Sequence, residues 1–216
     1  MHDARTSPRR GASLAVLGLV LVSLAAGPAS SQAPARGHGA EAHDMELVGH
    51  DELQGRSAYQ PTIHAQRGRF IAYVGHHGGR ARNPLTGADE DNGTSIVDVT
   101  DAARPRYLAH IAGPPGGSEQ GGAQMARVCD RQGKTYLLRT SGNAIPNAAH
   151  EVWDVTDPMK PQKVSTVVSG LTSTHKNWWE CDTGIAYLIS GDLVKKDPQQ
   201  LGPSRSFLRS TICTTP

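Results

Sequence analysis

Short apolar runs alternate with turn residues along the chain from about residue 45 onward. The first such unit has four runs, at about 57–65, 70–75, 94–99 and 106–111, with Gly, Pro, Asn or Asp residues between them. Short runs rich in Val, Ile and Tyr and bounded by turn residues are typical of β-strands. The pattern therefore predicts four short strands in succession.

A longer pattern repeats inside the chain. The segment SIVDVTD at 95–101, followed by Pro105, returns as EVWDVTD at 151–157, followed by Pro161. We interpret the closing Asp-x-x-x-Pro of each copy as a turn, because an Asp carboxylate can accept a hydrogen bond from the backbone N–H two residues on and Pro fixes φ. The mid-strand carboxylates, Asp98 and Asp154, are interpreted as solvated or turn-bonded groups with no catalytic role.

An apolar run around a tyrosine occurs three times. Tyr73, Tyr136 and Tyr187 are separated by 63 and 51 residues. These intervals are near the 40–50 residues typical of a propeller blade, once loop insertions are allowed. The sequence therefore predicts an all-β fold: a partial, open β-propeller of about two to three four-stranded antiparallel blades.

These motifs resemble a known repeat. The segments VDVTD at 97–101 and VWDVTDP at 152–158 resemble the LVIVD repeat of exported bacterial β-propeller proteins. The resemblance covers about residues 45–191, through further motifs at 49–50, 53–61, 75–79, 121–125 and 174–176. It implies an exported propeller of several four-stranded blades, a family for which no chemistry is generally established.

The N-terminal residues have the pattern of an export signal. Arg9 and Arg10 precede an apolar stretch at 14–26, and small residues follow it. We predict a signal peptide at 1–33, with a cleavage site that the sequence leaves open within a few residues. Residues 34–44 are read as a flexible linker, and the mature protein is expected in the periplasm or outside the cell.

Composition and charge argue against several classes of function and fold. The segment 1–33 holds three of the 22 Lys and Arg residues and one of the 20 Asp and Glu residues, so the remainder has 19 of each. A neutral chain without a basic run argues against nucleic-acid binding. The apolar stretch at 14–26 is too short to span a membrane. Gly and Pro together make up 38 of 216 residues, which argues against an all-α fold.

The expected third copy of the repeat is missing after Tyr187. Residues 192–216 are rich in Gln, Pro, Ser and Thr and show no alternation, so we predict a divergent, disordered tail. A closed propeller needs at least four blades. The chain is therefore interpreted as a truncated or frameshifted member of its class. The alternative is a natural short form that self-associates through its open blade edges.

Polar residues recur at similar offsets before the three tyrosines. Gln60, Gln124 and His175 lie 13, 12 and 12 residues before Tyr73, Tyr136 and Tyr187, at the expected start of each innermost strand. Together with Lys176, and with His76 and Arg139 at the ends of adjacent strands, they would surround the channel. Convergent polar groups of this kind favour a ligand site. The alternative is a set of side chains that only hydrogen-bond channel water.

The leading functional prediction is a non-catalytic binding or interaction module without a cofactor. Its partner would be a protein or small molecule that the sequence does not identify. The alternative is a copper or zinc enzyme that uses His175 and His76, although no pair of histidines has the spacing of a zinc-binding helix.

Cysteines and tryptophans give two further predictions. Cys129 and Cys181 lie seven and six residues before Tyr136 and Tyr187, so they occupy similar places on neighbouring strands and are candidates for a disulfide. Trp178 and Trp179 point to opposite faces of a strand. One of them is expected to pack between sheets, which leaves the other available for stacking on a ligand.

Overall fold

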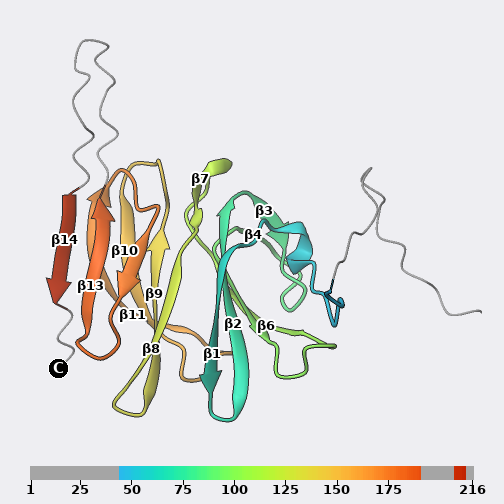
Figure 1. The fold of residues 1–216 in the computed structure, drawn as a ribbon. Helices are drawn as coiled ribbons and strands as arrows, with labels where there is room; N and C mark the ends of the chain where they lie inside the picture. The colour runs from blue at the N-terminus through green and yellow to red at the C-terminus, as the bar shows by residue number, and fades with distance from the viewer. Residues whose placement is uncertain (1–43, 191–206, 213–216) are drawn as a thin grey trace, which may run out of the picture. The chain divides into compact units, whose positions relative to one another are not determined.

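The computed structural model describes residues 44–190 and 207–212. The chain divides after Met45, and the account below concerns the second unit, Glu46–Pro216. The predicted signal peptide, nearly all of the predicted linker and much of the predicted tail lie outside the described residues. The described part is all-β, with several antiparallel sheets, none of them closed (Figure 1). It contains no helix long and apolar enough to cross a membrane.

The first sheet contains the four strands that the apolar runs predict. Its order is β1-β2-β5-β6, so each strand pairs with the next one in this series, always antiparallel. The bounds are Tyr59–Gln66 for β1, Arg69–Gly78 for β2, Thr94–Asp98 for β5 and Arg106–Ile111 for β6. A short 3-10 helix, η1 (Leu53–Gly55), precedes β1.

Two further sheets follow in chain order. The second is ordered β8-β9-β10-β11, with bounds Ala126–Arg131, Lys134–Ser141, Ala148–Asp154 and Gln162–Leu171. The third is ordered β12-β13-β14, with bounds Asn177–Trp179, Ile185–Ser190 and Phe207–Ile212. β14 lies within the tail for which the sequence predicts no strand. It pairs along the whole length of β13, whose other edge is only partly covered by the short β12.

Three further strands, β3, β4 and β7, lie outside the repeat pattern. β3 (Arg80–Arg82) and β4 (Asp89–Asp91) form a hairpin inserted between β2 and β5. β7 (Ser118–Ala123) pairs with the end of β2, where His76 is opposite Ala123. This approach requires glycine, because Gly122 has φ +65° and a Cβ there would lie 2.4 Å from the carbonyl oxygen of His76.

Alternating side chains place hydrophobic cores between successive sheets. Ile71 and Tyr73 of β2 pack with Val128 and Leu137 of the second sheet in one core. The next residue of β9, Leu138, faces the other way and joins Leu188 of the third sheet in a second core. Because adjacent strand residues point to opposite faces, the second sheet buries one face against each neighbour.

The two copies of the repeat make the same contacts. Asp98 accepts from the N–H of Thr100, and Asp154 accepts from the N–H of Thr156, both at 3.0 Å. The hydroxyl oxygen of each Thr accepts from the N–H of the second residue of the strand beside it, Phe70 in one copy and Thr135 in the other, again at 3.0 Å.

The closing Asp of each copy confirms the predicted turn. Asp101 accepts from the N–H of Ala103 at 3.2 Å, and Asp157 accepts from the N–H of Met159 at 3.0 Å. The carboxylates are therefore structural parts of a repeated turn.

Candidate functional site

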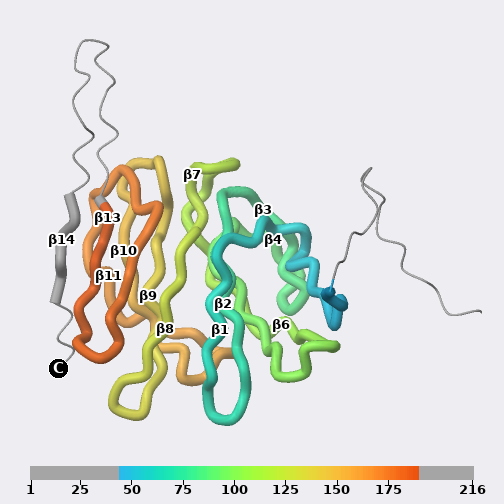
Figure 2. Tube along the Cα trace, in the orientation of Figure 1, coloured from blue at the N-terminus to red at the C-terminus, as the bar shows by residue number. Residues whose placement is uncertain are grey.

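The first strands of the three sheets lie side by side. β1 and β12 both contact β8, which lies between them, and Figure 2 shows β1 beside β8. The hydroxyl of Thr62 in β1 donates to the carbonyl of Ala126 at 2.9 Å, and His64 Nε2 lies 3.1 Å from a carboxylate oxygen of Asp130. We call β1, β8 and β12 the inner strands below, with β8 in contact with the other two.

A polar cluster lies near the starts of β1 and β12, and we call it the Tyr59 cluster. Its members are Tyr59, His77, Glu119, Gln124, His175 and Lys176. The Tyr59 hydroxyl lies 3.1 Å from His175 Nε2 and 2.5 Å from Lys176 Nζ. The ammonium group of Lys176 also lies 4.5 Å from the centroid of the Tyr59 ring. The first sheet and the segment that precedes β12 therefore meet at one tyrosine.

The protonation state of His175 follows from its surroundings. Burial lowers the pKa of His175, and the neighbouring charge of Lys176 lowers it further. His175 is therefore neutral near pH 7, and its Nε2 can accept a hydrogen bond from the Tyr59 hydroxyl. Lys176 has only donors, so it donates to the oxygen of Tyr59. The three groups form a directed chain of hydrogen bonds from Lys176 through Tyr59 to His175.

The other half of the cluster surrounds His77. Its ring meets that of Tyr59 edge-on, with 4.8 Å between the centroids. Its Nδ1 lies 3.2 Å from Glu119 Oε2 and 3.2 Å from Gln124 Nε2. The side-chain oxygen of Gln124 is buried and accepts no hydrogen bond from the described part of the chain. The cluster thus presents donors, acceptors and both signs of charge.

Three of the predicted channel residues lie outside the cluster. His76 is fully buried, with Nδ1 donating to the carbonyl of Ser57 at 2.6 Å and Nε2 2.7 Å from the Ser95 hydroxyl. Arg139 is buried against Glu151 and donates to the carbonyls of Ile111 and Ala112. Gln60 is exposed in β1. His76 therefore bonds within the first sheet and Arg139 links the second sheet to the first, while Gln124, His175 and Lys176 belong to the cluster.

A bulge explains the place of Gln60. Tyr59 pairs with Gly75 and Thr62 with Tyr73, so β1 contains one more residue than β2 over this stretch. The offset of 13 residues before Tyr73 selects Gln60, which lies within the bulge, whereas its neighbour Tyr59 lies at the cluster.

The two histidines of the metal alternative have different surroundings. Both ring nitrogens of His76 are engaged by Ser57 and Ser95, and His175 bonds to Tyr59. Among the residues that the structure describes, no three His, Cys, Asp or Glu side chains form a metal-binding group. The copper or zinc alternative remains a prediction from the sequence.

The inner strands also carry the two cysteines and the two adjacent tryptophans. A disulfide joins Cys129 of β8 to Cys181, just after β12, with 5.3 Å between the Cα atoms. Trp179 packs in the core between the second and third sheets, as expected for one of the pair. Trp178 is 54% exposed.

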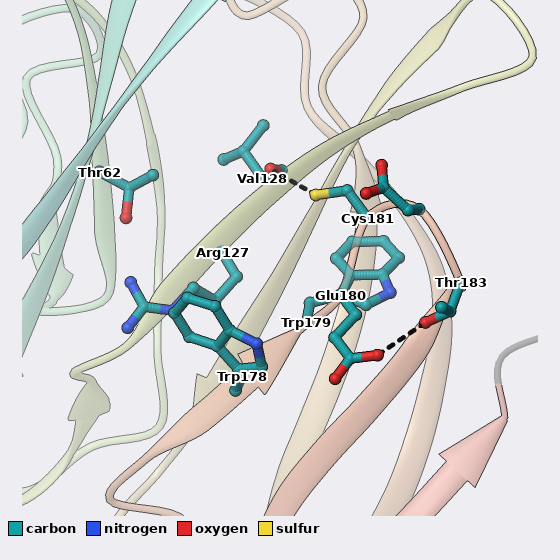
Figure 3. A pocket seen from close by; sticks show the side chains of 9 residues that line it. Thr62, Arg127, Val128, Trp178, Trp179, Glu180, Cys181 and Thr183 are labelled. Carbon is teal, nitrogen blue, oxygen red and sulfur yellow. Dashed lines mark hydrogen bonds between the residues drawn. The ribbon is translucent and has the colours of Figure 1, made fainter.

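A pocket of about 510 Å³ opens beside these residues (Figure 3). It is lined by β1, β8, β12 and the turn after β12, and in Figure 3 the side chain of Arg127 lies against the ring of Trp178. Its lining residues are Thr62, Arg127, Val128, Trp178, Trp179, Glu180, Cys181, Asp182 and Thr183.

Sequence reasoning missed Tyr59, His77 and Glu119 of the cluster and Arg127 of the pocket. Tyr59 and His77 belong to the motifs that carry the repeat resemblance, which is a usable signal. Glu119 lies in β7, whose glycines and polar residues do not form the alternating pattern of a strand. The sequence therefore gives no signal for Glu119. Arg127 is one of two arginines in β8, and no sequence pattern distinguishes it from Arg131.

No protein-family model matches the chain, and a comparison with curated proteins finds no similar sequence. The resemblance to LVIVD-repeat proteins therefore stays a prediction from the motifs. The functional interpretation depends on the geometry of the inner strands.

Proposed function

We propose that this protein is an exported, open β-propeller-type repeat protein that acts as a non-catalytic binding module. In this proposal the three sheets are successive blades, and β1, β8 and β12 are their innermost strands. The equivalent turns at Thr100 and Thr156 and the cores between successive sheets support it. Each blade buries its faces against its neighbours, as stacked repeat units do.

The observation that carries the proposal is the convergence of residues from distant segments around Tyr59, which begins β1. His77 comes from β2, Glu119 from β7, and His175 and Lys176 precede β12. Groups from segments far apart in the sequence form one accessible polar site, which is the usual form of a ligand-binding site. The side chains of Tyr59, His77, His175 and Lys176 are partly exposed, so a ligand can reach them.

The proposal is tested by NMR titration of the isotope-labelled chain with glucose, glutamate and inorganic phosphate as separate probes. At least one probe is expected to shift the backbone signals of Tyr59, His77 and Lys176 in a saturable way. Lys176→Gln should weaken that binding, whereas Lys160→Gln, on an exposed turn, should leave it unchanged. Shifts that map elsewhere for all three probes, or conversion of a probe into a new species, would contradict a non-catalytic binding site here.

A further inference from the structure

The pocket beside Trp178 is a second site that shares no residue with the Tyr59 cluster. Its volume of about 510 Å³ is within the range of small-molecule sites, about 300–1,000 Å³. Val128, Trp179 and the disulfide-bonded Cys181 give it an apolar wall. One guanidinium group, that of Arg127, extends into this setting (Figure 3).

Arg127 lacks the partners that a partly buried guanidinium needs. Its Nε is buried and donates to no acceptor in the described part of the chain, and within that part no carboxylate pairs with the group. Burial also lowers the pKa of Arg127. A guanidinium has five N–H donors, and the donor on Nε of Arg127 is buried without an acceptor, which is unfavourable. By contrast, Arg139 uses its donors on Glu151 and two backbone carbonyls.

Trp178 fixes the guanidinium and offers a flat surface. The Cζ atom of Arg127 lies 5.1 Å from the centroid of the Trp178 ring, within the range of a cation–π contact. The ring is 54% exposed even with Arg127 beside it. A planar ligand can therefore contact this aromatic surface while it faces the charged group.

Two carboxylates restrict the charge of the ligand. Glu180 and Asp182 line the pocket, and Glu180 accepts from the Thr183 hydroxyl at 2.9 Å. A second negative charge on a ligand would be repelled by these groups. Arg127 is the one cationic residue in this lining, so an anionic group would lie at Arg127 and the rest of the ligand would be uncharged.

We propose that this pocket binds a small aromatic monocarboxylate. The carboxylate pairs with the free donors of Arg127, a geometry in which arginine can form two parallel hydrogen bonds. The aromatic body lies against Trp178 and the apolar wall formed by Val128. The proposal needs only the local arrangement of β8 and β12, so it stands independently of the function assigned to the Tyr59 cluster.

Isothermal titration calorimetry with benzoate and with benzamide, its neutral analogue, tests the proposal. Benzoate should bind at one site, and benzamide at least ten times more weakly, a comparison that requires no variant. Arg127→Gln should weaken benzoate binding at least tenfold, while Arg131→Gln, in the same strand, should bind benzoate as the unaltered chain does. Trp178→Leu should weaken both probes.

Three results would overturn the proposal: no binding of benzoate, equal binding of benzoate and benzamide, or full binding by a folded Arg127→Gln chain. Circular dichroism of each variant shows whether it is folded. Benzoate could fail to bind while a probe still shifts the backbone NMR signals of Tyr59, His77 and Lys176. In that case the proposed aromatic carboxylate site is wrong, and the binding function proposed for the Tyr59 cluster is unaffected. The opposite pair of results would reject the Tyr59 cluster alone.

Discussion

Lys176 Nζ lies 2.5 Å from the hydroxyl of Tyr59, although the two residues are 117 positions apart in the chain. Tyr59 begins the first strand of the first sheet, and Lys176 directly precedes the first strand of the third. The contact therefore joins the first sheet to the segment that leads into the third, and both β1 and β12 contact β8 of the second sheet. The proposed binding site depends on this convergence.

The disulfide between Cys129 and Cys181 should contribute substantially to stability. It closes a loop of 52 residues and fastens the second sheet to the turn after β12. Reduction should lower the free energy of unfolding by about 2–4 kcal/mol, because the unfolded chain gains conformational freedom. Urea denaturation with and without dithiothreitol measures the difference.

Cys213→Ala provides the matched control for this experiment. The variant should keep both the stability of the oxidised chain and its response to dithiothreitol. A loss of the response in Cys213→Ala, or an equal stability of the oxidised and reduced forms, would show that the bond between Cys129 and Cys181 does not stabilise the fold.

The fold should lose stability in mild acid because two of its histidines are buried. His76 and His110 lie on either side of Ser95, and burial lowers the pKa of each from 6.5 to about 4. Between pH 6.5 and 4 the unfolded chain takes up protons that the folded chain does not. The free energy of unfolding should therefore fall as the pH falls through this window, by up to about 3 kcal/mol for each histidine.

The pH dependence can be assigned by substitution. Chemical denaturation at a series of pH values should show a shallower fall for His76→Gln than for the unaltered chain. His50→Gln changes an exposed histidine and should keep the full slope. The assignment would be contradicted if His76→Gln and His50→Gln had the same slope between pH 6.5 and 4.

The Arg139–Glu151 pair should be sensitive to the loss of its carboxylate. Arg139 Nη2 lies 2.9 Å from Glu151 Oε2, and both side chains are buried. Burial alone would raise the pKa of Glu151, but Arg139 and the hydrogen bonds from Lys163 and Trp153 outweigh it and lower the pKa to about 2. Glu151→Gln leaves a buried guanidinium without its counter-charge and should cost about 3–5 kcal/mol in urea denaturation.

Lys163→Gln is the control for this pair. Lys163 lies 2.7 Å from the other oxygen of Glu151, but its side chain is 43% exposed. Its removal should cost no more than about 1 kcal/mol, as is usual for exposed ion pairs. Similar losses for Glu151→Gln and Lys163→Gln would contradict the structural role given to Arg139.

The equivalence of the two repeat copies predicts matched mutational effects. Thr100→Val and Thr156→Val each remove the hydroxyl that accepts from the neighbouring strand. Each should lower the free energy of unfolding by about 1 kcal/mol. Thr166→Val, at an exposed position of β11, should change it by less than about 0.5 kcal/mol. Clearly unequal losses at positions 100 and 156 would show that the copies are not equivalent.

The strands of the repeat could be predicted from the sequence because their signal is local. Alternating apolar residues and Asp-centred turns mark β2, β5, β9, β10 and β13 within a few residues of their bounds. β7 was not predictable, because Gly122 allows a close approach to β2 and Gly121 a close approach to Pro115, so the strand has no alternating pattern. β14 lies in sequence without a strand pattern, and only the pairing with β13 makes it a strand.

The site was harder to predict, because it depends on contacts between distant segments. Gln124, His175 and Lys176 were found from offsets along the repeat, since those offsets place the start of each inner strand. The same offsets selected Gln60 instead of its neighbour Tyr59, because an offset along the sequence does not show the bulge between Tyr59 and Thr62. His76 looked like a channel residue, but its ring turns into the first sheet toward Ser95.

A double-mutant cycle on Tyr59→Phe and Lys176→Met tests the central claim most directly. If the inner strands converge as described, the two side chains interact, and the free energies of unfolding of the single and double variants should reveal a coupling of at least about 1 kcal/mol. Each variant keeps most of the side-chain volume, so packing changes contribute little. Strictly additive losses, with no coupling between Tyr59 and Lys176, would show that the inner strands of the first and third sheets do not meet at this site.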